Sequence, residues 1–341
     1  MNINNYSFQF EKIFQYINEH ECKNILIQIP EGLKHRFREL IKILEEKISA
    51  NILISADPCY GACDIISNKI SSLKIDLIIN LGHLPIPSIV DKNSIPTFYI
   101  NALSREDIIP VVEKAIPLLE DKNIGLTTIA QHIHKLSEVE EYLKEKGFNP
   151  IISNGDRRIA RRGQILGCNF TAGIKIADRV DKFLFIGSGM FHPLGLRLST
   201  KKPVIAVDPI SKKIRYQEIE DKKDSILRQR YGAIALAKTA QTYGIIVGLK
   251  IGQQRLEKAE EIKKLLVSKG KTAYILTMDM FSPVSLEGFT YIDCYISTAC
   301  PRIAIDDYLM YKKPILTPIE IEIAMGEKTW DSYEFDQILE E

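Results

Sequence analysis

One arrangement of apolar runs occurs three times along the chain, and this repeat limits the possible folds more than any other feature of the sequence. The copies open with "KNILIQIPEG" from Lys23, "KNIGLTTIAQ" from Lys122 and "YGIIVGLKIG" from Tyr243. In each copy a stretch with apolar residues at helical spacing follows, and then a second apolar run: "ANILISAD", "FNPIISNGD" or "TAYILTMD". Self-similarity of this kind indicates a fold built from repeated units.

Two landmarks recur later in each copy: an aspartate that opens a third apolar run, and a proline that opens a fourth. They are Asp76 and Pro96, Asp181 and Pro203, and Asp293 and Pro314, which lie 20, 22 and 21 residues apart. A proline at the first residue of a strand removes no hydrogen bond from the sheet. Because the spacing agrees in three places, we interpret the copies as homologous units.

Short apolar runs that alternate with helices predict βαβ units and parallel sheets covered by helices on both faces. Three units of roughly 100 residues each predict three domains. We therefore predict an α/β fold of three homologous α/β domains, each with a mainly parallel four-stranded sheet flanked by helices, arranged around a central site. The predicted domains are residues 1–104, 105–215 and 216–341, the last with a C-terminal appendage that packs on a partner subunit or frays.

Composition narrows the class of protein. The 341 residues are 45% apolar and carry a net charge of +1, so no overall field favours nucleic acid or an anionic membrane. The N-terminus lacks the layout of a signal peptide, and no apolar run approaches the ~20 residues of a membrane span. We expect a cytoplasmic protein that binds neither membrane nor nucleic acid directly.

The chain has six cysteines: Cys22, Cys59, Cys63, Cys168, Cys294 and Cys300. In a reducing cytosol, cysteines that converge favour a metal site over a disulfide framework. Cys22 and Cys294 flank or lie within strand-like runs, so we expect both to be small buried residues of the core.

Cys59 and Cys168 follow the second strands of their copies, and Cys300 ends the third strand of the third copy. Ligands gather beyond the carboxyl ends of parallel strands, so these three cysteines are candidates to meet at a shared centre. Three thiolates suit a soft metal centre, whereas structural zinc normally takes four closed ligands. The residues alone leave open the alternative of three unrelated core cysteines.

The stretches "ADPCYGACD", "GQILGCNF", "GSGMFHPLG" and "TACPRIAIDD", in this order and within the triplicated layout, carry a resemblance. From about Ile25 to about Glu322 the sequence resembles the diphthamide synthesis family, and within it the archaeal enzymes. The chain lacks the CxxxCxxC run of ordinary radical S-adenosylmethionine enzymes, which fits a family that assembles its cluster across domains.

The resemblance implies that Cys59, Cys168 and Cys300 hold a 4Fe–4S cluster that binds S-adenosylmethionine. It implies a transferase that releases the 3-amino-3-carboxypropyl group as a radical and attaches it to C2 of a histidine imidazole in translation elongation factor 2. Methylthioadenosine is the by-product. The resemblance also implies a homodimer and an electron donor. The alternatives are a non-catalytic three-domain module that binds a small ligand, or a partner subunit with a structural metal.

Several further residues are candidates for contacts with S-adenosylmethionine. The turn Gly187, Ser188 and Gly189 either offers backbone N–H groups to a carboxylate or is simply a tight turn. His192 is either a polar contact to the ligand or a loop histidine. Arg302 either pairs with the ligand carboxylate or is a solvated residue at a helix start. His83, at a strand end, is another candidate for the pocket.

Two further features have a simpler interpretation. Cys63 lies four residues beyond Cys59 and is predicted to be a small residue that packs behind the loop rather than a fourth ligand. The run "DRRIARRG", residues 156–163, is predicted to be a solvated face, with docking of the protein substrate or steering of an anionic cofactor as the alternative.

Overall fold

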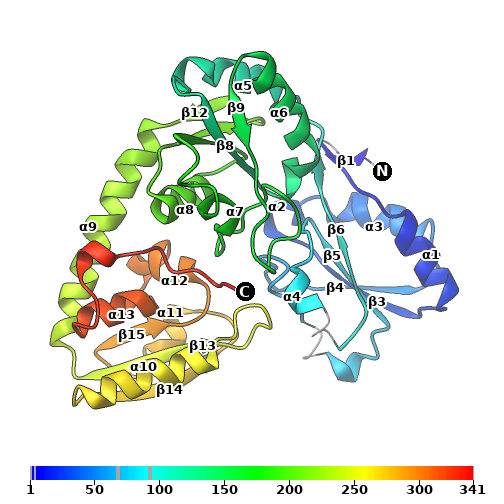
Figure 1. Cartoon of the computed structure of the whole chain (residues 1–341). Coiled ribbons are helices and arrows are strands. Elements are labelled where there is room, and N and C mark those ends of the chain that lie inside the picture. Colours follow the sequence, from blue (N-terminus) through cyan, green and yellow to red (C-terminus); the bar gives the residue numbers. More distant parts are fainter. Residues whose placement is uncertain (1, 4, 67–69, 91–93, 341) are drawn as a thin grey trace.

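The structure is a computed structural model that describes residues 2–3, 5–66, 70–90 and 94–340. Three parallel sheets occupy the corners of a triangle, in chain order blue to cyan, green, and yellow to orange in Figure 1. The fold class predicted from the repeat is confirmed. In each sheet the first strand of the copy lies between the second and the third, and the fourth follows the third.

The first sheet has the order β4-β3-β5-β6, and all its pairs are parallel. A small antiparallel sheet, β1-β2-β7, which the repeat does not predict, pairs the N-terminus with the end of this domain. The elements are β1 (Asn2–Ile3), β2 (Tyr6–Ser7), α1 (Glu11–Glu19), β3 (Asn24–Gln28), α2 (Glu31–Lys34), α3 (Phe37–Glu45), β4 (Asn51–Ile54), η2 (Ser71–Leu73), β5 (Leu77–Leu81), α4 (Pro87–Val90), β6 (Thr97–Ile100) and β7 (Leu103–Ser104).

The second sheet has the order β12-β11-β10-β8-β9, in which β12 is an antiparallel fifth strand where the repeat predicts four. The elements are α5 (Ile109–Ala115), η3 (Ile116–Leu118), β8 (Asn123–Thr128), η4 (Ala130–Lys135), α6 (Leu136–Glu145), β9 (Asn149–Ile151), α7 (Thr171–Ile174), β10 (Lys182–Ile186), α8 (Phe191–Thr200), β11 (Val204–Asp208) and β12 (Lys213–Arg215).

The third sheet has the order β14-β13-β15-β16 and is parallel throughout. The elements are α9 (Gln217–Thr239), β13 (Thr242–Gly248), α10 (Leu256–Ser268), β14 (Thr272–Met278), α11 (Pro283–Leu286), β15 (Cys294–Ser297), α12 (Pro301–Ile305), η5 (Tyr308–Met310), β16 (Ile315–Leu316), α13 (Pro318–Ala324) and η6 (Trp330–Ser332).

The repeated aspartate and proline have the same structural role in each sheet. The carboxylate of the aspartate accepts backbone N–H bonds where the first strand begins, at 2.7–3.2 Å. The carbonyl of the proline accepts an N–H bond from the third strand, at 2.8–2.9 Å. Both landmarks are thus fixed to the amino end of the sheet, which explains why their spacing agrees.

The central strands are buried on both faces, as predicted for parallel sheets covered by helices, whereas the edge strands β4 and β14 are partly exposed. Every residue of β5 and β11 is buried, and so are Cys22 and Cys294, as predicted. Among the described residues no helix is long and apolar enough to cross a membrane.

The second and third domains share elements. Ile219 and Ile226 at the start of α9 pack in the core of the second sheet, whereas Ile234 near its end packs in the core of the third. The predicted boundary after residue 215 therefore falls where a shared helix begins. The C-terminal segment neither frays nor stands apart, because Phe335 returns to the core of the second domain.

Candidate functional site

A cavity of about 780 Å³ lies between the three sheets. Most of the segments that line it follow the carboxyl ends of strands, namely β4, β5, β8, β9, β10, β11, β13, β14 and β15. Parallel sheets concentrate ligand sites at this edge, and here three such edges face one centre. The centre predicted from the repeat is therefore a real cavity.

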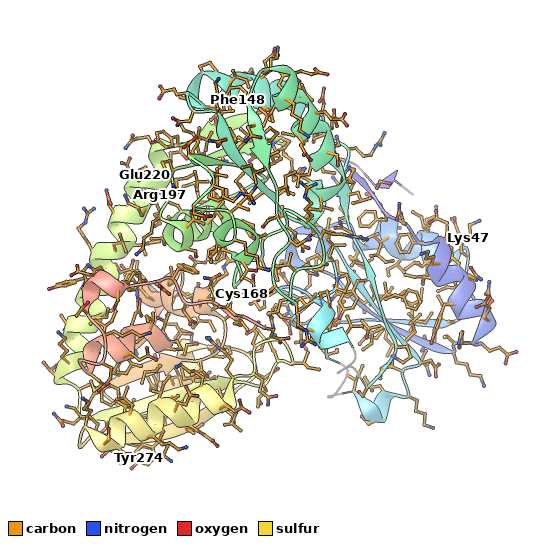
Figure 2. All side chains as sticks on the ribbon, in the orientation of Figure 1. Lys47, Phe148, Cys168, Arg197, Glu220 and Tyr274 are labelled. Atoms are coloured by element: carbon orange, nitrogen blue, oxygen red, sulfur yellow. The ribbon has the colours of Figure 1, made fainter. Side chains whose placement is uncertain are left out.

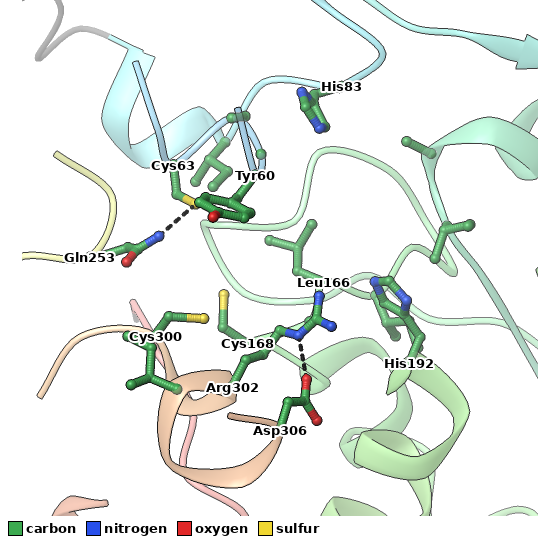
Figure 3. A pocket seen from close by; sticks show the side chains of 18 of the residues that line it. Tyr60, Cys63, His83, Leu166, Cys168, His192, Gln253, Cys300, Arg302 and Asp306 are labelled. Carbon is green, nitrogen blue, oxygen red and sulfur yellow. Dashed lines mark hydrogen bonds and ion pairs between the residues drawn. The ribbon is translucent and has the colours of Figure 1, made fainter. Parts of the chain in front are cut away.

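Three cysteines, one from each domain, line the cavity: Cys63, Cys168 and Cys300. Figure 3 shows their sulfur atoms turned toward a common space, with Cys168 and Cys300 on one side and Cys63 on the other. The structure brings Cys168 and Cys300 together, as the repeat predicts. It places Cys63 with them, and not Cys59.

Cys59 is buried behind the cavity wall and is only 2% exposed. Its Sγ accepts a hydrogen bond of 3.3 Å from Nδ2 of Asn80, whose Oδ1 lies 2.9 Å from Nδ1 of His83. Burial, reinforced by the charge of Asp64, raises the pKa of Cys59 to about 12. Cys59 therefore packs behind the cavity wall and contacts Asn80, which in turn contacts His83. This is the packing role that the sequence predicts for Cys63.

Cys63 is held by a loop of the third domain. Nε2 of Gln253 donates to its Sγ at 3.4 Å, and the N–H of Gly252 donates to its carbonyl at 3.1 Å. A Cβ at Gly252 would lie 2.5 Å from the Cβ of Cys63, so this close approach requires glycine. The buried ion pair Lys250–Asp64, 2.5 Å long, joins the same two loops.

Each of the other two cysteines is fixed near the end of a strand of its own domain. The N–H of Ile165 donates to the carbonyl of Thr128 at 2.9 Å, which ties the loop of Cys168 to the end of β8. Cys300 has extended backbone and precedes Pro301, the first residue of α12. Proline at this position suits a helix start because its missing N–H is not needed there.

The three thiols share a desolvated space. Burial raises the pKa of Cys63, and it raises that of Cys168 to about 11, with Cys63 adding to the effect. Burial also raises the pKa of Cys300, and Cys168 and Cys63 raise it further. Opposing these effects, Arg158 lowers the pKa of both Cys63 and Cys168. A thiolate at one of these positions therefore disfavours a second one, and a metal centre, which binds thiolates, would offset this effect.

These thiols do not surround a single ion. Within the described ranges no three His, Cys, Asp or Glu side chains are close enough together to bind one metal ion. A tetrahedral zinc site needs ligands that converge at about 2.3 Å from one point. Three thiols spread around a cavity fit a group of several atoms better, and iron–sulfur clusters are held by cysteine thiolates in this way.

The turn after β10 is only partly at the cavity. Ser188 lines it, and its hydroxyl donates to Oδ1 of Asp208 at 2.8 Å. The N–H of Gly187 donates to the carbonyl of Val207 and is therefore not available to a ligand, contrary to one of the two predicted roles. Gly189, with φ of +80°, supports the interpretation as a tight turn.

Three histidines line the cavity, His83, His132 and His192, and the sequence predicts the first and the last as candidates. Burial lowers the pKa of His83 to about 4. Burial, with a contribution from Arg302, also lowers the pKa of His192 to about 4. The His192 ring stacks on Phe185, with ring centres 6.1 Å apart. Both imidazoles are neutral at pH 7 and can form hydrogen bonds without adding a charge to the cavity.

Arg302 lies on the cavity wall and is oriented by two contacts. Its guanidinium carbon lies 3.7 Å from the centre of the Phe191 ring, and its Nε donates to Oδ2 of Asp306 at 2.8 Å. Figure 3 shows the guanidinium between the sulfur of Cys168 and His192. The side chain is about half exposed, so it can reach a ligand without losing its support.

Sequence reasoning missed three polar residues around Cys63: Lys250, Gln253 and Arg158. Lys250 and Gln253 follow β13, the first strand of the third copy. Polar residues just after such a strand could have been predicted to lie at the shared centre. Arg158 belongs to the run predicted to be solvated, but its side chain is only 2% exposed and donates to the carbonyl of Gly252 at 3.0 Å. The other arginines of the run, Arg157, Arg161 and Arg162, are exposed as predicted.

Comparisons with known proteins agree with this geometry. Residues 29–335 match the family of diphthamide synthesis proteins. The 2-(3-amino-3-carboxypropyl)histidine synthase of Pyrococcus horikoshii is 39% identical over 324 residues, covering 93% of this chain and 90% of the relative. The synthase of Methanocaldococcus jannaschii is 31% identical over 354 residues, covering 98% and 94%. The crystal structure of Dph2 from Pyrococcus horikoshii with a 4Fe–4S cluster matches with a TM-score of 0.88 at 36% identity, covering 98% of this chain and 94% of that one.

Proposed function

The chain belongs to the diphthamide synthesis protein family, and from that premise we propose that it is a 2-(3-amino-3-carboxypropyl)histidine synthase. It transfers the 3-amino-3-carboxypropyl group of S-adenosylmethionine to C2 of a histidine imidazole in translation elongation factor 2. The observation that carries the proposal is the cavity lined by one cysteine from each of three domains. We further propose a cytoplasmic homodimer that receives electrons from a separate donor.

The proposed ligands of a 4Fe–4S cluster are Cys63, Cys168 and Cys300. All three line the cavity, and the burial of Cys59 against Asn80 supports replacing Cys59 by Cys63 in this set. With three protein ligands, a cluster that is commonly held by four cysteines keeps one position for a substrate. A structural zinc site is not favoured, because the described thiols do not converge on one ion.

A bound cluster would supply the single electron with which the bond between the sulfonium sulfur and the methionine γ-carbon breaks. In the net transfer the new carbon–carbon bond replaces the C2–H bond of the histidine. The hydrogen leaves as a proton, the electron is returned, and methylthioadenosine is released.

The residues of the chain bind and orient the substrates in this proposal. Arg302 presents its guanidinium to the carboxylate of S-adenosylmethionine, and Asp306 and Phe191 hold it in place. His83 and His192 stay neutral and offer hydrogen bonds within the cavity. Ser188, anchored on Asp208, adds a polar group to the same wall.

The test is a product analysis. Protein purified without oxygen should be brown, contain about four irons per chain, and lose its colour on reduction with dithionite. Reduced protein with S-adenosylmethionine and elongation factor 2 should form methylthioadenosine and label the factor in equal amounts. Formation of 5′-deoxyadenosine instead would place the chain with ordinary radical enzymes, and a colourless protein would favour the ligand-binding module.

A further inference from the structure

The C-terminal segment returns to the centre of the molecule. After η6 the chain leaves the third domain and runs inward beside the second, as Figure 1 shows in red. Phe335 and Ile338 are buried in this segment, and the Phe335 ring packs edge-on against Phe170 with ring centres 5.6 Å apart. We name residues 334–340 the strap. The match to the family ends at residue 335, within the strap.

The strap binds the Cys168 loop directly. The N–H of Ile338 donates to the carbonyl of Cys168 at 2.8 Å, and its carbonyl accepts from Nδ2 of Asn169 at 3.0 Å. Oε1 of Gln337 accepts from the N–H of Phe170 at 2.8 Å. The strap therefore forms a hydrogen bond with each of three successive residues of the loop: Cys168, Asn169 and Phe170.

Arg255 connects the strap to Cys300. Its guanidinium donates to both carboxylate oxygens of Asp336, at 2.7 and 3.2 Å. The same guanidinium donates to the carbonyls of Thr298 and Ala299, the two residues that precede Cys300. A bidentate arginine–carboxylate pair is strong and directional, so it fixes the strap relative to the end of β15.

Arg158 connects the strap to Cys63. The carboxylate of Glu340 lies 3.2 Å from Nη1 of Arg158, which is buried. Nη2 of Arg158 donates to the carbonyl of Gly252, and the N–H of Gly252 donates to the carbonyl of Cys63. Three connections therefore lead from one short segment to the three cysteines that line the cavity.

We propose that the strap is a positioning segment that fixes the three cysteine-bearing loops relative to one another. The loops come from three separate sheets, so no single strand or helix fixes the separation of their thiols. This proposal rests on the proposed function only in its predictions for a bound iron–sulfur cluster. The strap's effect on the loops is a property of the chain itself.

The variant that tests the strap is Asp336→Ala in the full chain, with Glu220→Ala as the matched control. Glu220 forms a similar bidentate pair with Arg197, at 2.5 and 3.1 Å, and both arginines are 17% exposed. Figure 2 places the control pair on the outer side of the molecule, away from Cys168. The two variants thus each remove a bidentate arginine–carboxylate pair, at different places, and Glu220→Ala also removes the contact of Glu220 with Lys223 at 2.8 Å.

The measurement is the rate at which a maleimide alkylates each cysteine in the iron-free chain, followed by mass spectrometry. Asp336→Ala should raise the rates at Cys168 and Cys300 by about tenfold, because a lost charge-assisted bond favours local opening by that factor. Cys294, fully buried in the third core, is the internal reference and should not change. Glu220→Ala should leave Cys168 and Cys300 unchanged.

A second pair of variants addresses the Cys168 loop. Gln337→Met removes the acceptor for the N–H of Phe170 and should raise the rate at Cys168, whereas Gln337→Glu keeps an acceptor and should restore it. In iron-loaded protein, Asp336→Ala should also speed the removal of iron by a chelator and alter the electron paramagnetic resonance line shape.

Unchanged rates at Cys168 and Cys300 in Asp336→Ala would overturn the proposal. An equal rise in the Cys294 rate would indicate general destabilisation of Asp336→Ala. In that case Gln337→Met decides: a rise confined to Cys168 supports the proposal, and any other result overturns it. A wild-type chain that binds no iron would contradict the proposed function, and the alkylation rates would still decide for or against the strap.

Discussion

Cys59 and Cys63 lie on one turn of the first domain, yet they have opposite surroundings. Cys59 faces inward to Asn80 within its own domain, and Cys63 faces the cavity and a loop of the third domain. Cys59 is buried, whereas Cys63, like Cys168 and Cys300, is partly exposed. The repeat therefore predicts where this loop lies, whereas the contacts of Cys63 with the third domain depend on residues outside the repeated pattern.

Iron content should change most, and it should differ between variants of Cys63 and Cys59. Cys63→Ala should lose most of its iron after anaerobic reconstitution, as should Cys168→Ala and Cys300→Ala, because each removes one proposed ligand. Cys59→Ala should keep about four irons per chain and the wild-type visible spectrum. Iron analysis and absorbance measure both. Loss of iron in Cys59→Ala, with retention in Cys63→Ala, would restore the ligand set expected from the sequence.

A change in the loop that holds Cys63 should reduce both protein stability and iron retention. Gly252→Ala places a methyl group 2.5 Å from the Cβ of Cys63 and should destabilise the protein by about 1–3 kcal/mol while it reduces iron retention. Thermal unfolding and iron analysis check this.

The matched control for that loop is Gly232→Ala. It lies within α9 with nothing within 4 Å of the added Cβ, and it should stabilise the protein by about 0.5–1 kcal/mol. Equal behaviour of the two alanine variants would mean that the contact between Gly252 and Cys63 is unimportant.

A smaller effect is expected from the hydrogen bond on Cys63. Gln253→Leu removes a donor to its sulfur and should lower the midpoint potential of the cluster by on the order of 40 mV. A redox titration followed by electron paramagnetic resonance measures the shift. Cys59→Ala, which changes a sulfur outside the proposed set, should leave the potential unchanged. A shift in Cys59→Ala as large as that in Gln253→Leu would contradict the distinction between the two sulfurs.

The smallest effect is expected on the exposed side of the arginine run. Arg161→Glu should change the free energy of unfolding by less than about 0.5 kcal/mol and leave iron content unchanged, because this side chain is solvated. If turnover with the elongation factor falls and becomes sensitive to salt, the run docks the protein substrate. Normal, salt-insensitive turnover would exclude that role for Arg161.

Much of this architecture could be predicted from the sequence. The aspartate and proline landmarks recur because each has the same hydrogen bonds in its own sheet, so three sheets and their strand ends follow from the pattern. The same pattern predicts Cys168 and Cys300 at strand ends, and both line the cavity.

The remaining features depend on contacts between domains. The contacts that distinguish Cys63 from Cys59 come from Gly252 and Gln253, nearly 200 residues later in the chain. The buried Arg158 looks like its exposed neighbours until Gly252 and Glu340 are brought to it. The strap has no repeat or periodic pattern, and its main partners, Asn169, Arg255 and Arg158, lie far from it in the sequence.

The most direct measurement of the central claim is an anomalous difference map at the iron absorption edge, from crystals of protein reconstituted without oxygen. We predict one iron peak in the cavity, in contact with the sulfur atoms of Cys63, Cys168 and Cys300. An iron peak bonded to Cys59, or no iron within the cavity, would contradict it.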